Sequence, residues 1–135
     1  MCKMFGKKKE IKLESKKYFS IFLVILLIML IFTFIDFLIH SFKEEWSVPD
    51  YYFRNKIIFG TLIGFITYLF VKNKENLFKS LVFSGVTSVL LQIRYFLEGY
   101  SIKFVLEFLI IHFLVLFIIS LIIFKLIEKL MIERR

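Results

Sequence analysis

Four long apolar stretches separated by short charged segments dominate the pattern of the chain. They cover residues 18–41, 53–71, 78–100 and 104–124, all approximately. A helix rises 1.5 Å per residue, so ~20 residues cross a ~30 Å hydrocarbon layer. The second stretch reaches that length only if Arg54, Lys56 and Lys72 extend their charges to the membrane surfaces. The pattern predicts an all-α integral membrane protein, a single domain over residues 1–135 folded as an antiparallel four-helix transmembrane bundle.

The segment that follows the fourth stretch is amphipathic. Leu126, Ile127, Leu130 and Met131 share one helical face, and charged residues occupy the opposite face. This pattern predicts that the last helix continues to about residue 132 and lies on the membrane surface or against a partner.

Composition removes most other classes of protein. Of the 135 residues 59% are hydrophobic, and the mean hydropathy is +0.81, whereas a soluble domain is about 45–50% apolar. A soluble globule and a disordered chain are therefore excluded, and a single cysteine excludes a disulfide scaffold. Alanine is absent, so glycine, serine and threonine must provide the close contacts between helices.

The basic residues are distributed unequally between the two sides of the predicted membrane. Seven lie in residues 1–17, three in 72–79 and four after residue 124, which is fourteen of the 19 on one side. By the positive-inside rule both termini are expected in the cytoplasm and the protein in the cell membrane. The basic tail 1–17 should contact anionic lipid headgroups rather than nucleic acid. The lysines proposed for that contact are Lys7, Lys8, Lys9, Lys16 and Lys17.

Small residues indicate which helix faces pack together. Gly60 and Gly64 form a GxxxG motif, which allows another helix, or a second copy of the chain, to approach closely. The third stretch carries one continuous helical stripe. Its members are Ser80, Ser84, Thr87, Leu91, Arg94 and Glu98. We therefore expect the third helix at the centre of the bundle, against the second, with Ser80, Ser84 and Thr87 as packing residues.

Six ionisable side chains that lie within the predicted spans or at their outer thirds form the candidate site. They are Asp36, His40, Arg94, Glu98, Glu107 and His112. With the predicted orientation, all six fall in the outer half of the bilayer, where charge is costly and commonly functional. One hypothesis is structural: Arg94 is neutralised by one of the three carboxylates, and the cluster only fixes helix register. The other is a proton- or ion-coupled transport site, with two histidines that titrate near neutral pH.

Two further interpretations of these residues remain open. Asp36, His40, Glu107 and His112 carry suitable metal ligands, although no HExxH or comparable spacing occurs. A catalytic site would need a nucleophile beside a base, and no recognisable motif surrounds any serine or threonine.

The function expected from the sequence is non-enzymatic. No P-loop, GxGxxG motif or cysteine pair is present, so no catalytic residue, cofactor or metal is assigned. The chain should transport a small solute, ion or lipid headgroup, or act as an accessory subunit of a membrane complex, as a homodimer or in a larger assembly. The alternative is a membrane-embedded enzyme or metal-binding protein that uses the six-residue cluster.

Overall fold

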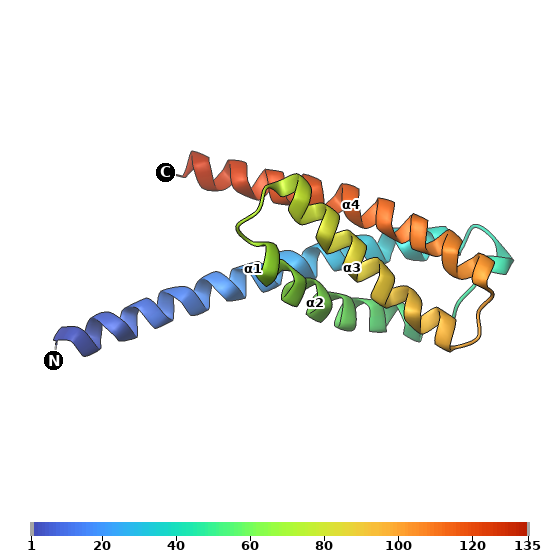
Figure 1. The fold of residues 1–135 in the computed structure, drawn as a ribbon, viewed down its shortest axis with the longest axis horizontal. Coiled ribbons are helices and arrows are strands. Elements are labelled where there is room, and N and C mark those ends of the chain that lie inside the picture. The colour runs from blue at the N-terminus through green and yellow to red at the C-terminus, as the bar shows by residue number, and fades with distance from the viewer. Residues whose placement is uncertain (1, 135) are drawn as a thin grey trace.

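The computed structural model describes residues 2–134 and contains four long helices packed in one bundle (Figure 1). These are α1 (Cys2–His40), α2 (Tyr51–Val71), α3 (Asn76–Leu97) and α4 (Ile102–Glu133), with a short 3-10 helix, η1 (Glu44–Trp46). Met1 and Arg135, the latter counted in the charge asymmetry, lie outside the described residues. Each long helix is long and apolar enough to cross a membrane. The predicted all-helical chain with four such helices is confirmed.

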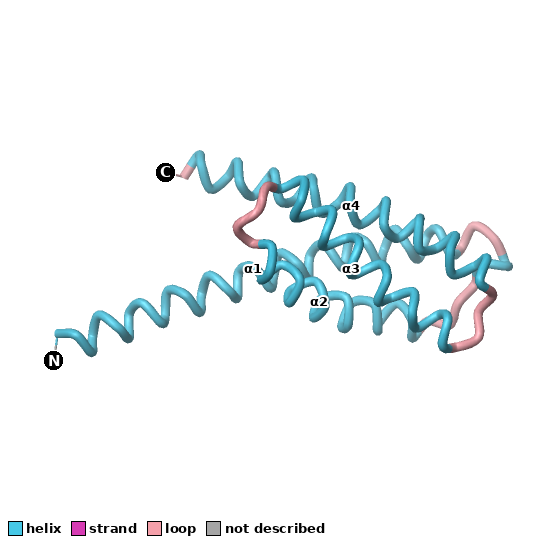
Figure 2. The backbone as a smooth tube through the Cα atoms, viewed as in Figure 1, coloured by secondary structure: helices cyan, strands magenta, loops and turns pink. Residues whose placement is uncertain are grey.

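Successive helices run in opposite directions, so the connections fall at two ends of the bundle (Figure 2). Both chain termini and the turn 72–75 lie at one end, which we call the terminal end. The loop 41–50, which contains η1, and the turn 98–101 lie at the other, which we call the η1 end.

Two helices extend beyond their apolar stretches. α1 begins at Cys2 rather than near residue 18, because the tail is rich in lysine and glutamate, which are good helix formers. α4 continues to Glu133, as its amphipathic pattern predicts. The N-terminal part of α1 projects from the bundle at the terminal end (Figure 1).

The sharp turn between α3 and α4 is defined by two capping motifs. Gly99 has φ +88°, and its N–H donates to the Phe96 carbonyl at 3.2 Å while the Tyr100 N–H donates to the Tyr95 carbonyl at 3.2 Å. This is the Schellman arrangement, in which glycine tolerates the left-handed conformation. Ser101 then begins α4, since its hydroxyl accepts the Phe104 N–H at 3.2 Å. The turn thereby sets α4 antiparallel to α3.

The two glycines of α2 face the interior of the chain's own bundle. A Cβ on Gly64 would lie 2.5 Å from Cε2 of Phe83 in α3, and one on Gly60 would collide with the Met29 side chain of α1. Both glycines are buried. Within the chain this face packs against α1 and α3, and its use as an interface with a second copy stays a prediction.

Replacing Gly64 with alanine should destabilise the fold by about 1–3 kcal/mol, the usual cost of overpacking a core. The Phe83 ring is fully buried, and the new methyl group would lie closer to it than van der Waals contact allows. The measurement is the unfolding midpoint in mild detergent. Gly85→Ala is the matched control, because the nearest atom to its new Cβ is 3.8 Å away. Equal midpoints for the two variants would contradict this packing.

Candidate functional site

Near the η1 end, all four helices contribute polar side chains to one enclosed group, which we call the buried cluster. Its members are Asp36 and His40 of α1, Lys56 of α2, Gln92 of α3 and His112 of α4. Their exposed fractions are between 0 and 4%. Burying charge at this depth is unfavourable unless each charge is paired and hydrogen-bonded, so the contacts inside the cluster determine whether it is stable.

The Asp36 carboxylate is the centre of the cluster, and both of its oxygens are engaged. The Lys56 ammonium donates to Oδ2, which makes a buried ion pair. His112 Nε2 lies 2.8 Å from Oδ1. Lys56 Nζ is also 3.5 Å from His40 Nε2, so the ammonium contacts a second partner on α1. One carboxylate and one ammonium balance to zero net charge when both imidazoles are neutral.

The partners of the two histidines fix opposite tautomers. The Trp46 carbonyl, 2.5 Å from His40 Nδ1, can only accept a hydrogen bond, so His40 carries its proton on Nδ1. Its Nε2 is then free to accept from Lys56. In His112, Nδ1 accepts from the Gln92 amide nitrogen at 2.6 Å, so the proton is on Nε2 and points to Asp36.

Aromatic rings enclose the cluster. The His40 ring stacks on Phe108 with centroids 4.2 Å apart, and Phe32 meets His112 edge-on at 5.3 Å. The Tyr95 ring lies 5.1 Å from Lys56 Nζ and contributes a cation–π contact. Because these rings exclude water, the local dielectric is low and each charge–charge contact is stronger than at a surface.

Helical spacing explains how each element presents its residue. Asp36 and His40 are four apart and share one face of α1. On α2, Lys56 lies four residues before Gly60, and Gly64 follows four later, so the lysine belongs to the same buried face as the glycines. That shared face was the sequence signal for Lys56. Its charge was predicted to reach the membrane surface, and this prediction is wrong, because the Lys56 side chain is only 3% exposed.

The structure does not bring the other three candidates into the buried cluster. Arg94 pairs with Glu98 at 3.0 Å, and both side chains are about one-third exposed, 35% and 34%. Glu107 is 41% exposed and lies 3.9 Å from Lys103. Arg94, expected as the buried cation, is at the edge of the inner face of α3, where its long side chain reaches the surface. Lys56 holds the buried position instead.

Asp36, His40 and His112 also satisfy the distance requirement of a metal site. One ligand atom from each lies within 4.8 Å of the others, and imidazole and carboxylate are common zinc ligands. Glu107, the fourth expected ligand, is not part of this group. The Lys56 ammonium is bound to the same carboxylate, so a positive charge already occupies that position. The donor set therefore suits proton exchange better than metal binding.

Buried hydroxyl groups continue from the cluster toward the terminal end. Four fully buried hydroxyl residues lie on α3, namely Ser80, Ser84, Thr87 and Ser88. The first of them, Ser80, is twelve residues, or ~18 Å along the helix, from Gln92. The Ser84 hydroxyl donates to the Ser80 carbonyl at 2.6 Å. Within residues 2–134, the Thr87 and Ser88 hydroxyls have no hydrogen-bond partner. We call this row of four residues the hydroxyl column. Gln92 therefore has the hydroxyl column on one side, toward the terminal end, and the rest of the buried cluster on the other.

Comparison of this chain with protein-family models, with curated proteins and with solved structures found no match. Its function is therefore argued from the chemistry of the site, since a fold alone does not determine function.

Proposed function

We propose that this chain is a non-enzymatic membrane transporter of a small ion, the proton, which the buried cluster takes up and releases. One observation carries the proposal. A continuous series of polar contacts runs from Gln92 through His112, Asp36, Lys56 and His40 to the Trp46 carbonyl in the loop at the η1 end.

That series suits proton transfer because its central members each have a protonated and a deprotonated form. A proton can leave Lys56 for His40, because Lys56 Nζ and His40 Nε2 lie 3.5 Å apart. Once His112 has taken up a second proton, it can pass its Nε2 proton to Asp36 Oδ1, which lies 2.8 Å from Nε2. Both steps redistribute charge inside the cluster without changing its total, so neither step adds to the cost of a net charge in the hydrocarbon layer.

The hydroxyl column supplies the other half of the path. Hydroxyls both donate and accept hydrogen bonds, so Thr87 and Ser88 can pass protons or bind water between the cluster and the terminal end. We further propose that the terminal end is cytoplasmic, since it carries most of the basic residues. The cluster then receives protons from outside through the η1 loop, in the cell membrane.

Proton movement in proteoliposomes tests the proposal. The purified chain is reconstituted, a pH gradient is imposed under a valinomycin-clamped potential, and an enclosed pH dye is followed. We expect flux above that of empty liposomes. His112→Gln should reduce it to the empty-liposome level, because glutamine can keep hydrogen bonds but cannot titrate.

Glu107→Gln is the matched control, since it also removes one ionisable group but lies outside the cluster. Its flux should equal that of the unsubstituted chain. A folded chain without flux, or a His112→Gln variant with full flux, would contradict the proposal.

An accessory subunit is the second candidate, and the projecting part of α1 favours it. Met4 and Phe5 are 78% and 73% exposed on a helix segment that does not pack on the bundle (Figure 1). A partner within a membrane complex would cover such residues. Under this function the flux stays at the empty-liposome level, whereas the transporter requires it to rise.

A further inference from the structure

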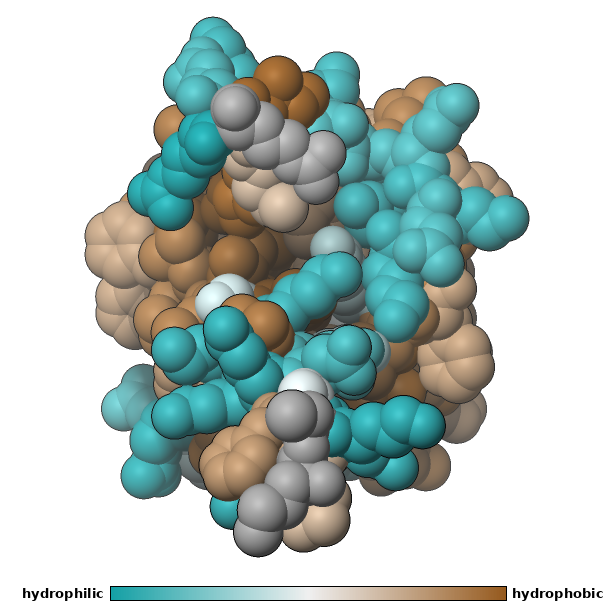
Figure 3. Space-filling view, turned by 90° about the vertical axis from the view of Figure 1, so that its left-hand side faces the viewer, coloured by the Kyte–Doolittle hydropathy of each residue, from teal (hydrophilic) through white to brown (hydrophobic). Residues whose placement is uncertain are grey.

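A cavity of about 640 Å³ opens at the terminal end, distant from the buried cluster. It forms where α1 diverges from α4, and the turn 72–75 closes one side. Figure 3 looks onto this end and shows a hydrophobic hollow bordered by hydrophilic surface. Its volume is in the range of sites that bind small molecules.

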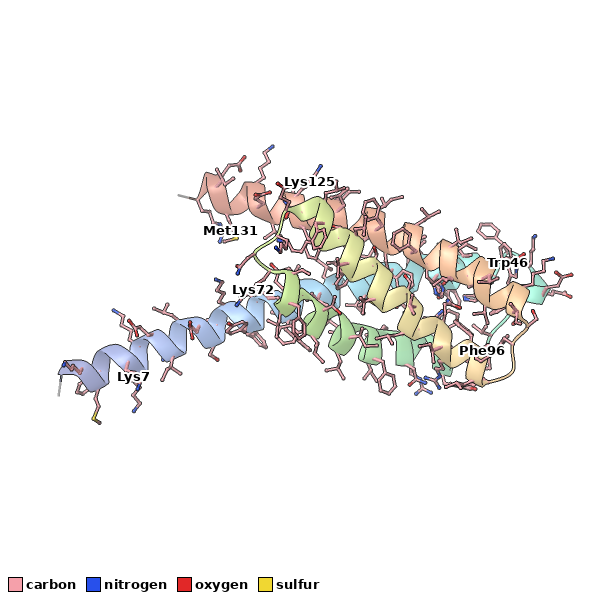
Figure 4. The ribbon with its side chains drawn as sticks, viewed as in Figure 1. Lys7, Trp46, Lys72, Phe96, Lys125 and Met131 are labelled. Carbon is pink, nitrogen blue, oxygen red and sulfur yellow. The ribbon has the colours of Figure 1, made fainter. Side chains whose placement is uncertain are left out.

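The walls of the cavity are mostly apolar. Ile21, Val24 and Ile25 line it from α1, and Phe124 and Ile127 line it from α4. Met131 adds to these walls from the side of α4 that faces α1 (Figure 4). Lys72, labelled in the same figure, lies at this end of the bundle and belongs to the rim described next. A ligand that fills this space must therefore present a hydrocarbon portion to the walls.

The rim of the cavity is strongly basic. Lys17, Lys72, Lys74 and Lys79 line it, and none of the four forms a salt bridge with any residue from 2 to 134. The acidic lining residues are fewer, Glu75 and Glu128, and Glu128 accepts a hydrogen bond from Asn76. The rim therefore carries an excess of positive charge that is complementary to an anionic group.

Lys79 is held at the inner edge of the rim. Its Nζ lies 5.3 Å from the Tyr68 ring centroid and 5.4 Å from that of Phe124. Lys72 Nζ is 3.4 Å from the Tyr18 hydroxyl. These contacts keep two ammonium groups directly above the apolar walls, the arrangement that an anionic head on a hydrocarbon chain requires.

We propose that this cavity binds one anionic phospholipid, with its phosphate on Lys72 and Lys79 and the upper part of an acyl chain between α1 and α4. Charge complementarity selects an anionic head, and the apolar walls select an attached chain rather than a soluble phosphate. The inference uses no residue of the buried cluster and does not depend on proton transport.

Lipid retention measured by native mass spectrometry tests the proposal. The chain in neutral detergent is titrated with phosphatidylglycerol, phosphatidylcholine or glycerol 3-phosphate. We expect one molecule of phosphatidylglycerol to be retained at concentrations where neither of the others is. Lys72→Gln combined with Lys79→Gln should weaken that retention about 30-fold, at the usual strength of a basic residue near an anionic surface.

Lys125→Gln combined with Lys129→Gln is the matched control, because both lysines lie on α4 at the same end but do not line the cavity. It should retain lipid like the unsubstituted chain. Equal losses in the two double variants would show only diffuse attraction and overturn the site. Equal retention of phosphatidylcholine would overturn the choice of an anionic head. Retention of glycerol 3-phosphate as strong as that of the lipid would overturn the need for an acyl chain.

Discussion

Replacing Lys56 with methionine should lower the free energy of unfolding by about 3–5 kcal/mol, the usual cost of leaving one partner of a buried ion pair without the other. The Asp36 carboxylate is 1% exposed, so neither water nor a surface cation can replace the lost ammonium. The measurement is unfolding of the purified chain in mild detergent, followed by circular dichroism.

Two further variants make this result specific to the pair. Asp36→Leu combined with Lys56→Met should recover most of the lost stability, since both charges are removed together and apolar side chains of similar size replace them. Arg94→Met removes a cation from a pair that is about one-third exposed, and should cost less than about 1 kcal/mol. If Arg94→Met is as harmful as Lys56→Met, the buried cation has been wrongly assigned.

The same double variant should move no protons. In proteoliposomes its flux should fall to the level of empty liposomes although its stability is restored, because the series of contacts between His112 and His40 passes through Asp36 and Lys56. Restored stability with full flux would mean that the cluster only holds the helices in register, which is the structural hypothesis for these residues.

The fold was largely predictable because the apolar stretches determine where helices can span a membrane. The four stretches agree with α1 to α4 to within a few residues, apart from the early start of α1 and the continuation of α4 to Glu133, which the amphipathic pattern predicted. That start was not visible in the hydrophobic pattern, since residues 2–17 are mostly polar. Lysine and glutamate favour a helix through their backbone propensity and give no periodic apolar signal.

The site was only partly predictable, because charge alone does not show which way a side chain points. Asp36, His40 and His112 were found as ionisable residues inside apolar stretches. Lys56 was missed because it lies near the start of α2, where a long side chain usually reaches the surface. Lys56 nevertheless lies on the inner face of α2, because it is four residues before the buried Gly60. Gln92 was missed because it carries no charge.

The most direct test of the account is the protonation of the two histidines, which are the only ones in the chain. Nitrogen-15 chemical shifts of labelled imidazoles, with His40→Gln used to assign the two rings, report which ring nitrogen carries the proton. Contacts in the buried cluster predict opposite neutral tautomers, with the proton on Nδ1 of His40 and on Nε2 of His112. The same tautomer in both rings would contradict the buried cluster on which the proposed function rests. So would rings that interconvert rapidly between the two tautomers, as free imidazole does in water.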